Sequence, residues 1–368
     1  MLSLECSDAR TADFDYELPQ ELIAQAPAEP RDAARLMVVD RRTGRLAHRT
    51  FAELDQLLTP NDLLVANRTR VMPARLVGQR VGSGGRAEAL LPRQTNEHEW
   101  EALVRPGRRL QPGALVEFAG NGNKLVVEVG SRLPGGQRRL RVAEPRAAAE
   151  QLLALGQAPL PPYVDNWSGE FERYQTVYAD RPGSAAAPTA GLHFTPGLLA
   201  RVREAGVGLK FITLHIGPDT FRPIRVAWLA CHQMDAEWAE VSSETMAAIR
   251  GARQRGGRIV AVGTTTVRAL ESVAAQERAS GRVGRPASGT ADIAPGCGGW
   301  SGWTRLFIQP GHRFRWVDAM ITNFHLPRST LMVLVSAFAG RERIMAAYHE
   351  AIEREYRFYS FGDAMLLV

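Results

Sequence analysis

Three histidines follow apolar, strand-like runs of the sequence, where side chains from neighbouring strands can converge. His215 ends the run FITLH, His325 follows DAMITNF, and His193 closes the small-residue stretch GSAAAPTAGLH. Histidine titrates near neutral pH, so it is well suited to act as a general base or acid. Taken singly, each histidine is more typical of a core residue whose ring nitrogens are hydrogen-bonded, but three at corresponding strand ends favour a shared site. They are the predicted catalytic residues, and the sequence does not choose among them.

The stretch before His193 predicts one wall of a ligand pocket. Residues 183–195 read GSAAAPTAGLHFT and are dominated by alanine, glycine and threonine. Small residues allow backbone groups to approach a flat ligand closely, where larger side chains would collide. We predict that residues 187–193 line the pocket, with Thr189 and His193 facing the ligand. The alternative is a tight structural loop packed under a neighbouring helix.

The segment RIVAVGTTTVRALES, residues 258–272, predicts an anion-binding helix start. It passes from an apolar strand through Gly263 and three threonines into a helical pattern. Thr264 or Thr265 can cap the helix, so that the N–H groups of the first turn point outward beside the positive end of the helix dipole. Arg268 lies in the same turn. An ordinary capped helix is the alternative, and for this segment alone it is the simpler interpretation.

An α/β domain must position these residues. After residue 148, helical stretches such as PGLLARVREAG precede apolar strands such as LKFITLHIG, which is typical of an α/β domain with a largely parallel sheet. In open sheets of this kind, ligands bind beyond the carboxyl ends of the strands, and Asn323 and the histidines fall there. Nearer the N-terminus, RLMVVD and RRTGRLAHR predict a hairpin across a Thr-Gly turn.

Residues 60–148 have a different pattern. Short strands such as DLLVAN, WEALVR and KLVVEVG alternate with turns rich in glycine and proline, as in a small all-β barrel or sandwich. We therefore predict an α/β main domain, formed by residues 1–59 and 149–368, that is interrupted by an inserted small all-β barrel domain, residues 60–148. Residues 276–299 are small, polar and rich in glycine, and predict a mobile surface loop.

Composition limits the class of protein. The chain has 368 residues, 45% of them hydrophobic and 23% charged, as in a globular protein of two domains. No apolar run reaches the roughly 18 residues that a membrane span needs, and the N-terminal residues do not form a signal peptide. Cys6, Cys231 and Cys297 lie far apart without a CxxC pair, which argues against a zinc site and a disulfide framework. We expect a cytoplasmic protein with no metal and no membrane partner.

Arginine supplies nearly all of the positive charge. The net charge is +6, and the only lysines are Lys124 and Lys210. Arginine forks match phosphate oxygens, so a nucleic acid is one candidate partner; a codon bias toward arginine is the bland alternative. Six arginines of the predicted barrel form the candidate nucleic-acid-binding surface: Arg105, Arg108, Arg109, Arg138, Arg139 and Arg141. A solvated, arginine-rich surface explains this cluster equally well.

Longer segments resemble one known family. They include FDYELPQELIAQAPAEPRDAARLMVVD, LPPYV, GSAAAPTAGLHFT, FITLHIG, RIVAVGTTTVRALES, GWTRLFIQPG, DAMITNFHLPRSTLMVLVSAFAGRE and YRFYSFGDAML, in order along essentially the whole chain. The barrel segment contributes NRTRVMPARL and WEALVRPGRRL. Together they resemble the S-adenosylmethionine:tRNA ribosyltransferase-isomerases of queuosine biosynthesis.

The resemblance implies a reaction. S-adenosylmethionine would serve as the ribosyl donor, and 7-aminomethyl-7-deazaguanine at the wobble position of a tRNA as the acceptor. The products would be epoxyqueuosine in tRNA, adenine and methionine. Such a reaction needs a base that removes a proton from the carbon beside the sulfonium, and a proton or hydrogen bond for the departing adenine. It needs no metal or cofactor beyond S-adenosylmethionine, and we expect the enzyme to be a monomer.

The resemblance also implies roles for the strand-end residues. We expect six of them to bind the donor: Thr189, Gly263, Thr264, Thr265, Arg268 and Asn323. Thr264, Thr265 and Arg268 would hold its methionyl carboxylate. The sequence departs from the family pattern at four positions, which are Arg68, Asp219, Asp235 and Thr266.

Two other classes of function are compatible with this sequence. A same-fold enzyme could transfer the ribosyl group to a small amine, in which case free base would react without tRNA. A catalytically silent relative could bind tRNA without releasing adenine, and the replacements at Asp219 and Asp235 are its only support.

Overall fold

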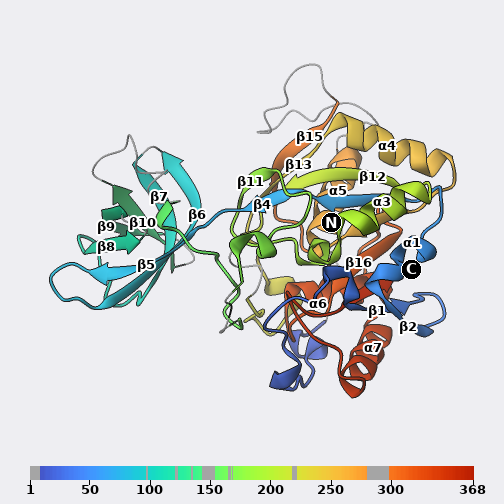
Figure 1. Cartoon of the computed structure of the whole chain (residues 1–368), viewed down its shortest axis with the longest axis horizontal. Helices are drawn as coiled ribbons and strands as arrows, with labels where there is room; N and C mark the ends of the chain where they lie inside the picture. The colour runs from blue at the N-terminus through green and yellow to red at the C-terminus, as the bar shows by residue number, and fades with distance from the viewer. Residues whose placement is uncertain are drawn as a thin grey trace, which may run out of the picture.

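The computed structural model of the protein describes residues 9–368 except 97, 121–122, 134–135, 143–153, 165–166, 168, 218–221 and 280–297. Figure 1 shows an α/β body, in which helices pack around a large sheet, with a β-barrel beside it. The predicted combination of an α/β fold with a small β-barrel is therefore confirmed.

Nine strands form the large sheet, and their spatial order differs from their order along the chain. In spatial order they are β15 (Trp300–Thr304), β13 (Glu237–Val241), β12 (Gly208–Leu214), β3 (Leu63–Asn67), β14 (Ile259–Val262), β16 (Ala319–Asn323), β17 (Ala364–Leu367), β1 (Arg35–Val39) and β2 (Leu46–Thr50). The contacts β12–β3, β3–β14, β14–β16 and β17–β1 are parallel. The contacts β15–β13, β13–β12, β16–β17 and β1–β2 are antiparallel.

The predicted largely parallel sheet is thus a mixed sheet whose parallel part lies mainly at its centre. Helix α4 (Ser243–Gln254) lies between β13 and β14 in the chain, and α5 (Thr264–Ala279) lies between β14 and β15. The strands β12, β14 and β16 run parallel where they meet β3 or each other. By contrast, β2 follows β1 directly across the predicted Thr-Gly turn, where Gly44 has a φ of 77°. The hairpin prediction is confirmed, and hairpin neighbours are necessarily antiparallel.

Alternate residues of the central strands belong to two apolar cores. In β3, Leu63 and Val65 pack into one core, whereas Leu64 and Ala66 pack into the other. Helices α4, α5, α6 (Thr330–Ala339) and α7 (Arg341–Glu353) cover the first face, and α1 (Leu54–Leu57) and α3 (Pro196–Glu204) cover the second. Because both faces are buried, the central strands are continuous apolar runs in the sequence.

Short 3-10 helices connect these elements. They are η1 (Thr11–Phe14), η2 (Gln20–Leu22), η3 (Arg31–Ala33), η4 (Phe51–Glu53), η7 (Phe171–Tyr174), η8 (Thr189–His193) and η10 (Leu229–Cys231). None of the helices within the described ranges is both long and apolar enough to cross a membrane.

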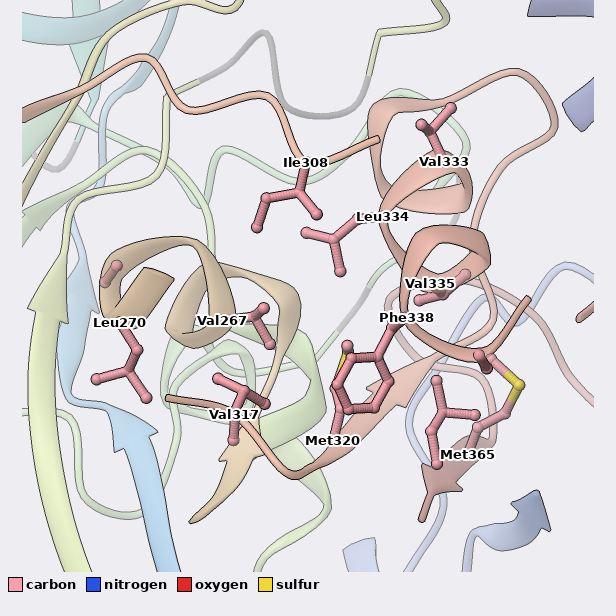
Figure 2. Close-up of a cluster of buried hydrophobic side chains, with 14 of the residues drawn as sticks. Val267, Leu270, Ile308, Val317, Met320, Val333, Leu334, Val335, Phe338 and Met365 are labelled. Atoms are coloured by element: carbon pink, nitrogen blue, oxygen red, sulfur yellow. The ribbon is translucent and has the colours of Figure 1, made fainter. Parts of the chain in front are cut away.

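Helix α5 is held firmly against the sheet. Figure 2 shows Val267 and Leu270 of α5 in the same apolar cluster as Phe338 of α6 and Met320 of β16. On the same helix, the buried carboxylate of Glu271 accepts hydrogen bonds from the N–H groups of residues 315–317, at 2.9–3.1 Å. These contacts fix the direction of α5, so that its N-terminus lies at the carboxyl end of β14.

Six strands close into the barrel, which has its own apolar core. They are β5 (Arg75–Arg80), β6 (Arg86–Asn96), β7 (Glu99–Arg105), β8 (Leu115–Gly120), β9 (Asn123–Arg132) and β10 (Arg138–Val142). A two-stranded sheet of β4 (Thr69–Val71) and β11 (Arg181–Ser184) lies on the path between the large sheet and the barrel (Figure 1).

The predicted segment boundaries differ from the structure in two places. Residues 60–148 include β3, which lies at the centre of the large sheet, because DLLVAN has the same short apolar pattern as a barrel strand. The predicted loop, residues 276–299, begins inside α5, which ends at Ala279, and its residues 280–297 lie outside the described part of the chain. The predicted junction between residues 148 and 149 also lies outside the described residues.

Candidate active site

Two adjoining pockets lie at the carboxyl ends of β14 and β16. The first, here called the aromatic pocket, is lined by Tyr163, Thr189, Asn323, Phe324, His325, Leu326, Ser329, Leu331, Tyr359 and Ser360. The second, here called the helix-start pocket, is lined by Ala187, Pro188, Thr189, Ala190, Ile216, Gly263, Thr264, Thr265, Thr322, Asn323, His325 and Leu331. Thr189, Asn323 and His325 line both, so the two pockets meet at these polar side chains.

The side-chain amide of Asn323 joins three segments of the chain. Its Oδ1 accepts a hydrogen bond from the hydroxyl of Thr189 at 2.9 Å, and its Nδ2 donates to Nε2 of His193 at 3.1 Å. The same Nδ2 lies 3.5 Å from the carbonyl oxygen of Asp363. Asn323 is the last residue of β16, and it therefore holds η8 against the carboxyl end of the sheet.

His193 lies behind the wall of the pocket and does not line it. Its buried ring is 4.9 Å from the ring of Phe51, and the main chain of Arg31 hydrogen-bonds to it. Burial lowers the pKa of His193 to about 4, although the nearby Asp363 carboxylate opposes this shift. At neutral pH the ring is uncharged, and its Nε2 accepts the hydrogen bond that orients Asn323.

His325 lines both pockets and is also uncharged. Its Nε2 lies 2.7 Å from the hydroxyl of Thr322, and its main-chain N–H donates to the Tyr348 hydroxyl at 2.8 Å. Burial lowers the pKa of His325 to about 3. Among the described pocket residues it is the one imidazole that a ligand can reach, so the structure separates it from the other two predicted catalytic histidines.

His215 lies just outside the helix-start pocket. The next residue, Ile216, lines the pocket, whereas the His215 ring stacks on Trp238 with 5.3 Å between ring centroids. Its Nδ1 lies 2.8 Å from the Thr69 hydroxyl, and burial lowers the pKa of this histidine. His215 and His325 follow strands of the large sheet, whereas His193 ends the 3-10 helix η8, and the three rings do not converge on one space.

The start of α5 forms one side of the helix-start pocket. The carbonyl of Gly263 accepts the first helical hydrogen bonds, from Thr266 at 3.1 Å and Val267 at 3.3 Å, so Gly263 occupies the N-cap position of α5. The sequence predicted Thr264 or Thr265 in this position; with its φ of 88°, Gly263 makes the turn that an L-residue adopts only under strain. The N–H groups of Thr264 and Thr265 therefore belong to the first turn, where helix geometry supplies no acceptor.

The structure places Arg268 away from the pocket. Its guanidinium forms a buried ion pair with Glu237 at 2.5 Å, and donates to the carbonyl oxygens of Asp235 at 2.8 Å and Thr304 at 3.0 Å. Glu237 also accepts a hydrogen bond from the N–H of Gly217. The charge of Arg268 is thus matched by a carboxylate, and the residue joins α5 to β13 and to the edge strand β15.

Several pocket residues were not singled out from the sequence, among them Tyr163, Tyr359 and Ser360. Tyr163 and Tyr359 lie with their ring centroids 4.8 Å apart, and the Tyr163 hydroxyl is 2.6 Å from that of Ser360. Burial raises the pKa of Tyr163 to about 12, so its hydroxyl stays neutral. Tyr359 has a φ of 71°, a strained conformation for a residue with a side chain. The segments LPPYV and YRFYSFGDAML carry these residues, but no periodic pattern marks them.

The six predicted nucleic-acid-binding arginines of the barrel differ in their surroundings. Arg138 is buried and hydrogen-bonds to the Gly107 carbonyl, whereas Arg139 and Arg141 pair with the carboxylate of Glu99 at 3.3 and 2.6 Å. Three are exposed around the turn that follows β7, and no carboxylate of the described residues forms an ion pair with them: Arg105, Arg108 and Arg109.

The positions at which the sequence departs from the family pattern lie outside the pockets where they are described. Asp235 is exposed, and its carbonyl accepts the bond from Arg268. Thr266 is buried, with its hydroxyl bonded to the carbonyl of Val262, and Arg68 lies 3.7 Å from Asp180. Asp219 lies outside the described residues. Among the residues described, no group of His, Cys, Asp or Glu side chains is placed to hold a metal ion.

The chain belongs to the family of queuosine biosynthesis proteins, whose sequence pattern matches residues 11–367. Curated relatives named S-adenosylmethionine:tRNA ribosyltransferase-isomerase narrow the assignment. The relative from Symbiobacterium thermophilum is 51% identical over 360 residues, 98% of this chain and 100% of its own. The relative from Heliobacterium modesticaldum is 49% identical over 357 residues, 96% of this chain and 98% of its own.

A solved structure agrees with these relatives. The crystal structure of an S-adenosylmethionine tRNA ribosyltransferase from Thermotoga maritima is 38% identical in sequence, covers 97% of this chain and 100% of its own, and has a TM-score of 0.53.

The two buried histidines make stability fall in acid. In the folded protein the pKa of His193 is about 4 and that of His325 about 3, below the value of roughly 6.5 for an unfolded histidine. Between these values the unfolded chain binds more protons, so the free energy of unfolding should decrease as pH falls from 6.5 toward 4, by about 1.4 kcal/mol per pH unit for each histidine. In urea unfolding of the H193N variant, the free energy of unfolding should depend less steeply on pH, by about 1.4 kcal/mol per pH unit, because one titrating histidine is gone. H349N, at an exposed position of α7, is the control and should keep the full slope; an unchanged slope in H193N would contradict the assignment.

Proposed function

We propose that this protein transfers and isomerises the ribosyl group of S-adenosylmethionine onto 7-aminomethyl-7-deazaguanine at the wobble position of tRNA. The products are epoxyqueuosine in tRNA, adenine and methionine. The observation that carries the proposal is the match of nearly the whole chain, at about half identity, to enzymes named for this reaction. S-adenosylmethionine is then a co-substrate, and we expect the protein to work as a monomer in the cytoplasm, where tRNA is modified.

The two pockets suit two different parts of the donor. The aromatic pocket suits a flat purine ring by its chemistry, because Tyr163, Phe324 and Tyr359 offer ring surfaces and Ser360, bonded to the Tyr163 hydroxyl, adds a polar group. A carboxylate fits the helix-start pocket, because the first N–H groups of α5 and the helix dipole both favour an anion there. We therefore place adenine in the first pocket and the methionyl carboxylate at Thr264 and Thr265. The ribosyl group then lies between them, beside Thr189 and His325.

His325 is the base that this arrangement favours. A neutral imidazole can take up a proton, and the positive sulfonium acidifies the ribosyl carbon beside it. Because burial makes His325 a weak base, removal of the proton depends on that acidity and on the polar contact of Nε2 with Thr322. Because Nε2 faces the Thr322 hydroxyl, the abstracted proton goes to Nδ1, and Thr322 Oγ1 accepts the hydrogen bond from Nε2–H of the imidazolium. His193 acts through Asn323 by holding the Thr189 hydroxyl toward the pocket, and is a positioning residue.

The barrel is proposed as an inserted domain that contacts the tRNA backbone. Its strands span residues 75–142 and enclose a separate core, which supports an independent domain. Arg105, Arg108 and Arg109 offer exposed cations for phosphate contacts, which provide affinity without reading sequence. Arg139 and Arg141 share one carboxylate and contribute less, because Glu99 already offsets part of their charge.

Incubation with labelled S-adenosylmethionine and tRNA that carries the precursor base tests the function. We expect adenine and methionine to form, and H325A to lose turnover by about 100-fold or more if this histidine transfers the proton. tRNA without the precursor base is the matched control and should give no adenine. Product formed from free base without tRNA would instead favour the small-amine enzyme, and tRNA binding without adenine release would favour the silent relative.

The helix start can be tested by removing one N–H group. Proline is well tolerated at the first position of a helix, so T264P deletes the donor of Thr264 while keeping α5. Loss of a charge-assisted bond of about 1.5 kcal/mol should raise the Michaelis constant for S-adenosylmethionine about tenfold. T264A keeps the N–H and should behave like the wild type. Decarboxylated S-adenosylmethionine should bind T264P and wild type equally; a difference for this analogue would place the carboxylate elsewhere.

Salt dependence tests the barrel surface. Each neutralised phosphate contributes roughly one unit to the slope of log affinity against log salt concentration. Replacing Arg105, Arg108 and Arg109 with glutamine should flatten the slope for tRNA by about 2–3 units and leave donor binding intact. The matched control replaces Arg250, Arg253 and Arg255 of α4 and its end, far along the chain from the barrel. If the barrel variant keeps the full slope and the control loses it, the tRNA lies on α4 instead.

A further inference from the structure

A row of aromatic rings leads away from the helix-start pocket to the edge of the sheet. The N–H of His215 bonds to the carbonyl of Trp238 at 3.0 Å, and Trp238 pairs directly with Trp303 in the ladder of β13 and β15. Residues that lie directly opposite in antiparallel strands project from the same face. His215, Trp238 and Trp303 therefore stand side by side across three strands, and Ile216, next to the first of them, lines the pocket.

In the described part of the chain, this face of β13 and β15 lies outside the second apolar core. Every second residue of β13 is buried on the side of the sheet that faces the first core: Glu237, Ala239 and Val241. Trp238 is half-buried on the opposite face, and Trp303 is 54% exposed on β15, which is the edge strand. A tryptophan with more than half of its surface in water is unusual in a folded chain, and a large exposed ring beside a binding pocket indicates a contact surface.

The charges around the row favour an anionic partner at the pocket end. Arg305 follows β15 and is exposed, with one guanidinium nitrogen bonded to the Met234 carbonyl at 3.2 Å. Arg181 is exposed on β11. Its carbonyl accepts a hydrogen bond from the Thr69 hydroxyl, and this hydroxyl also contacts Nδ1 of His215. Glu240 lies two residues beyond Trp238 on the same face, away from the pocket end. A partner with phosphates therefore approaches over Arg305 and Arg181.

We infer that Trp238 and Trp303 form a stacking surface for the unpaired bases that flank the reacting base in the anticodon loop of the tRNA. Single-stranded RNA is bound by flat side chains that stack on successive bases and by cations that contact its backbone, and this edge supplies both next to the pocket. The inference rests on the proposed function, because it takes the reacting base to be in the pocket. His215 then supports the Trp238 ring from behind.

The test measures RNA binding separately from turnover. The probe is a labelled anticodon stem–loop RNA that carries 7-aminomethyl-7-deazaguanine, titrated with the full chain by fluorescence anisotropy. W303A should weaken binding about tenfold, since stacking contributes about 1–3 kcal/mol per base and 1.4 kcal/mol is tenfold. W303F should retain most of the affinity. The control is W228A, because Trp228 is also exposed, at 41%, but contacts Arg10 and lies outside the row.

A second set of RNAs distinguishes stacking from a structural role. Stem–loops with one flanking base removed at a time should bind the wild type more weakly at one position, and at that position W303A should cause no further loss. The Michaelis constant for S-adenosylmethionine should stay unchanged in W303A, whereas R305Q should lower the salt slope by about one unit. Additive losses for every abasic RNA, unchanged affinity in W303A, or a dimer that W303A dissociates would each overturn the inference.

The outcomes for the row and for the function are separate. Adenine release by the wild type together with tight RNA binding by W303A would leave the function standing and reject the row. RNA binding that depends on Trp303 without adenine release would reject the function and keep the row as an RNA surface.

Discussion

The pocket depends on satisfying one buried amide. Asn323 ends a central strand, and its oxygen and nitrogen must both find partners because the side chain is out of contact with water. Thr189, His193 and the Asp363 carbonyl supply them, from a 3-10 helix and from the segment before β17. These bonds hold η8 against the end of β16. The wall of small residues, the direction of the Thr189 hydroxyl and the junction of the two pockets all follow from this placement of η8.

Much of the site could be predicted because it lies at strand ends. Searching for polar residues directly after apolar runs finds Thr265, Asn323 and His325, which do line the pockets. The same search also finds His193 and His215, which do not line them, and neither does Arg268, which was predicted from the first turn of the helix. A residue that follows a strand is known to lie at that edge of the sheet. Whether its side chain enters the pocket depends on partners far along the chain. Glu237 draws Arg268 toward β13, and no local pattern reveals that pairing.

The fold, like the site, could be predicted only in part. Turn spacing separated the barrel from the α/β body, and the Thr-Gly hairpin was found from its residues. Whether neighbouring strands run parallel or antiparallel was not predictable, because an apolar run of five residues has the same pattern in both arrangements. β3 was assigned to the barrel because its apolar run resembles a barrel strand. Its neighbours in the sheet, β12 and β14, follow in the sequence only after the barrel strands. Tyr163 and Tyr359 lie in irregular segments, for which periodicity has no signal.

That interruption of the sheet has a consequence for folding order. β3 must pair with β12, and the whole barrel lies between them in the chain. Closing so long a loop costs entropy and slows the pairing of distant strands. However, the two ends of the barrel segment bond to each other, Arg75 with Gln157, in both directions at 3.2 and 2.7 Å. A barrel that folds first on its own core therefore brings β4 and β11 together and shortens the effective distance that β3 must bridge. Damage to the barrel core should for this reason delay assembly of a sheet to which the barrel contributes no strand.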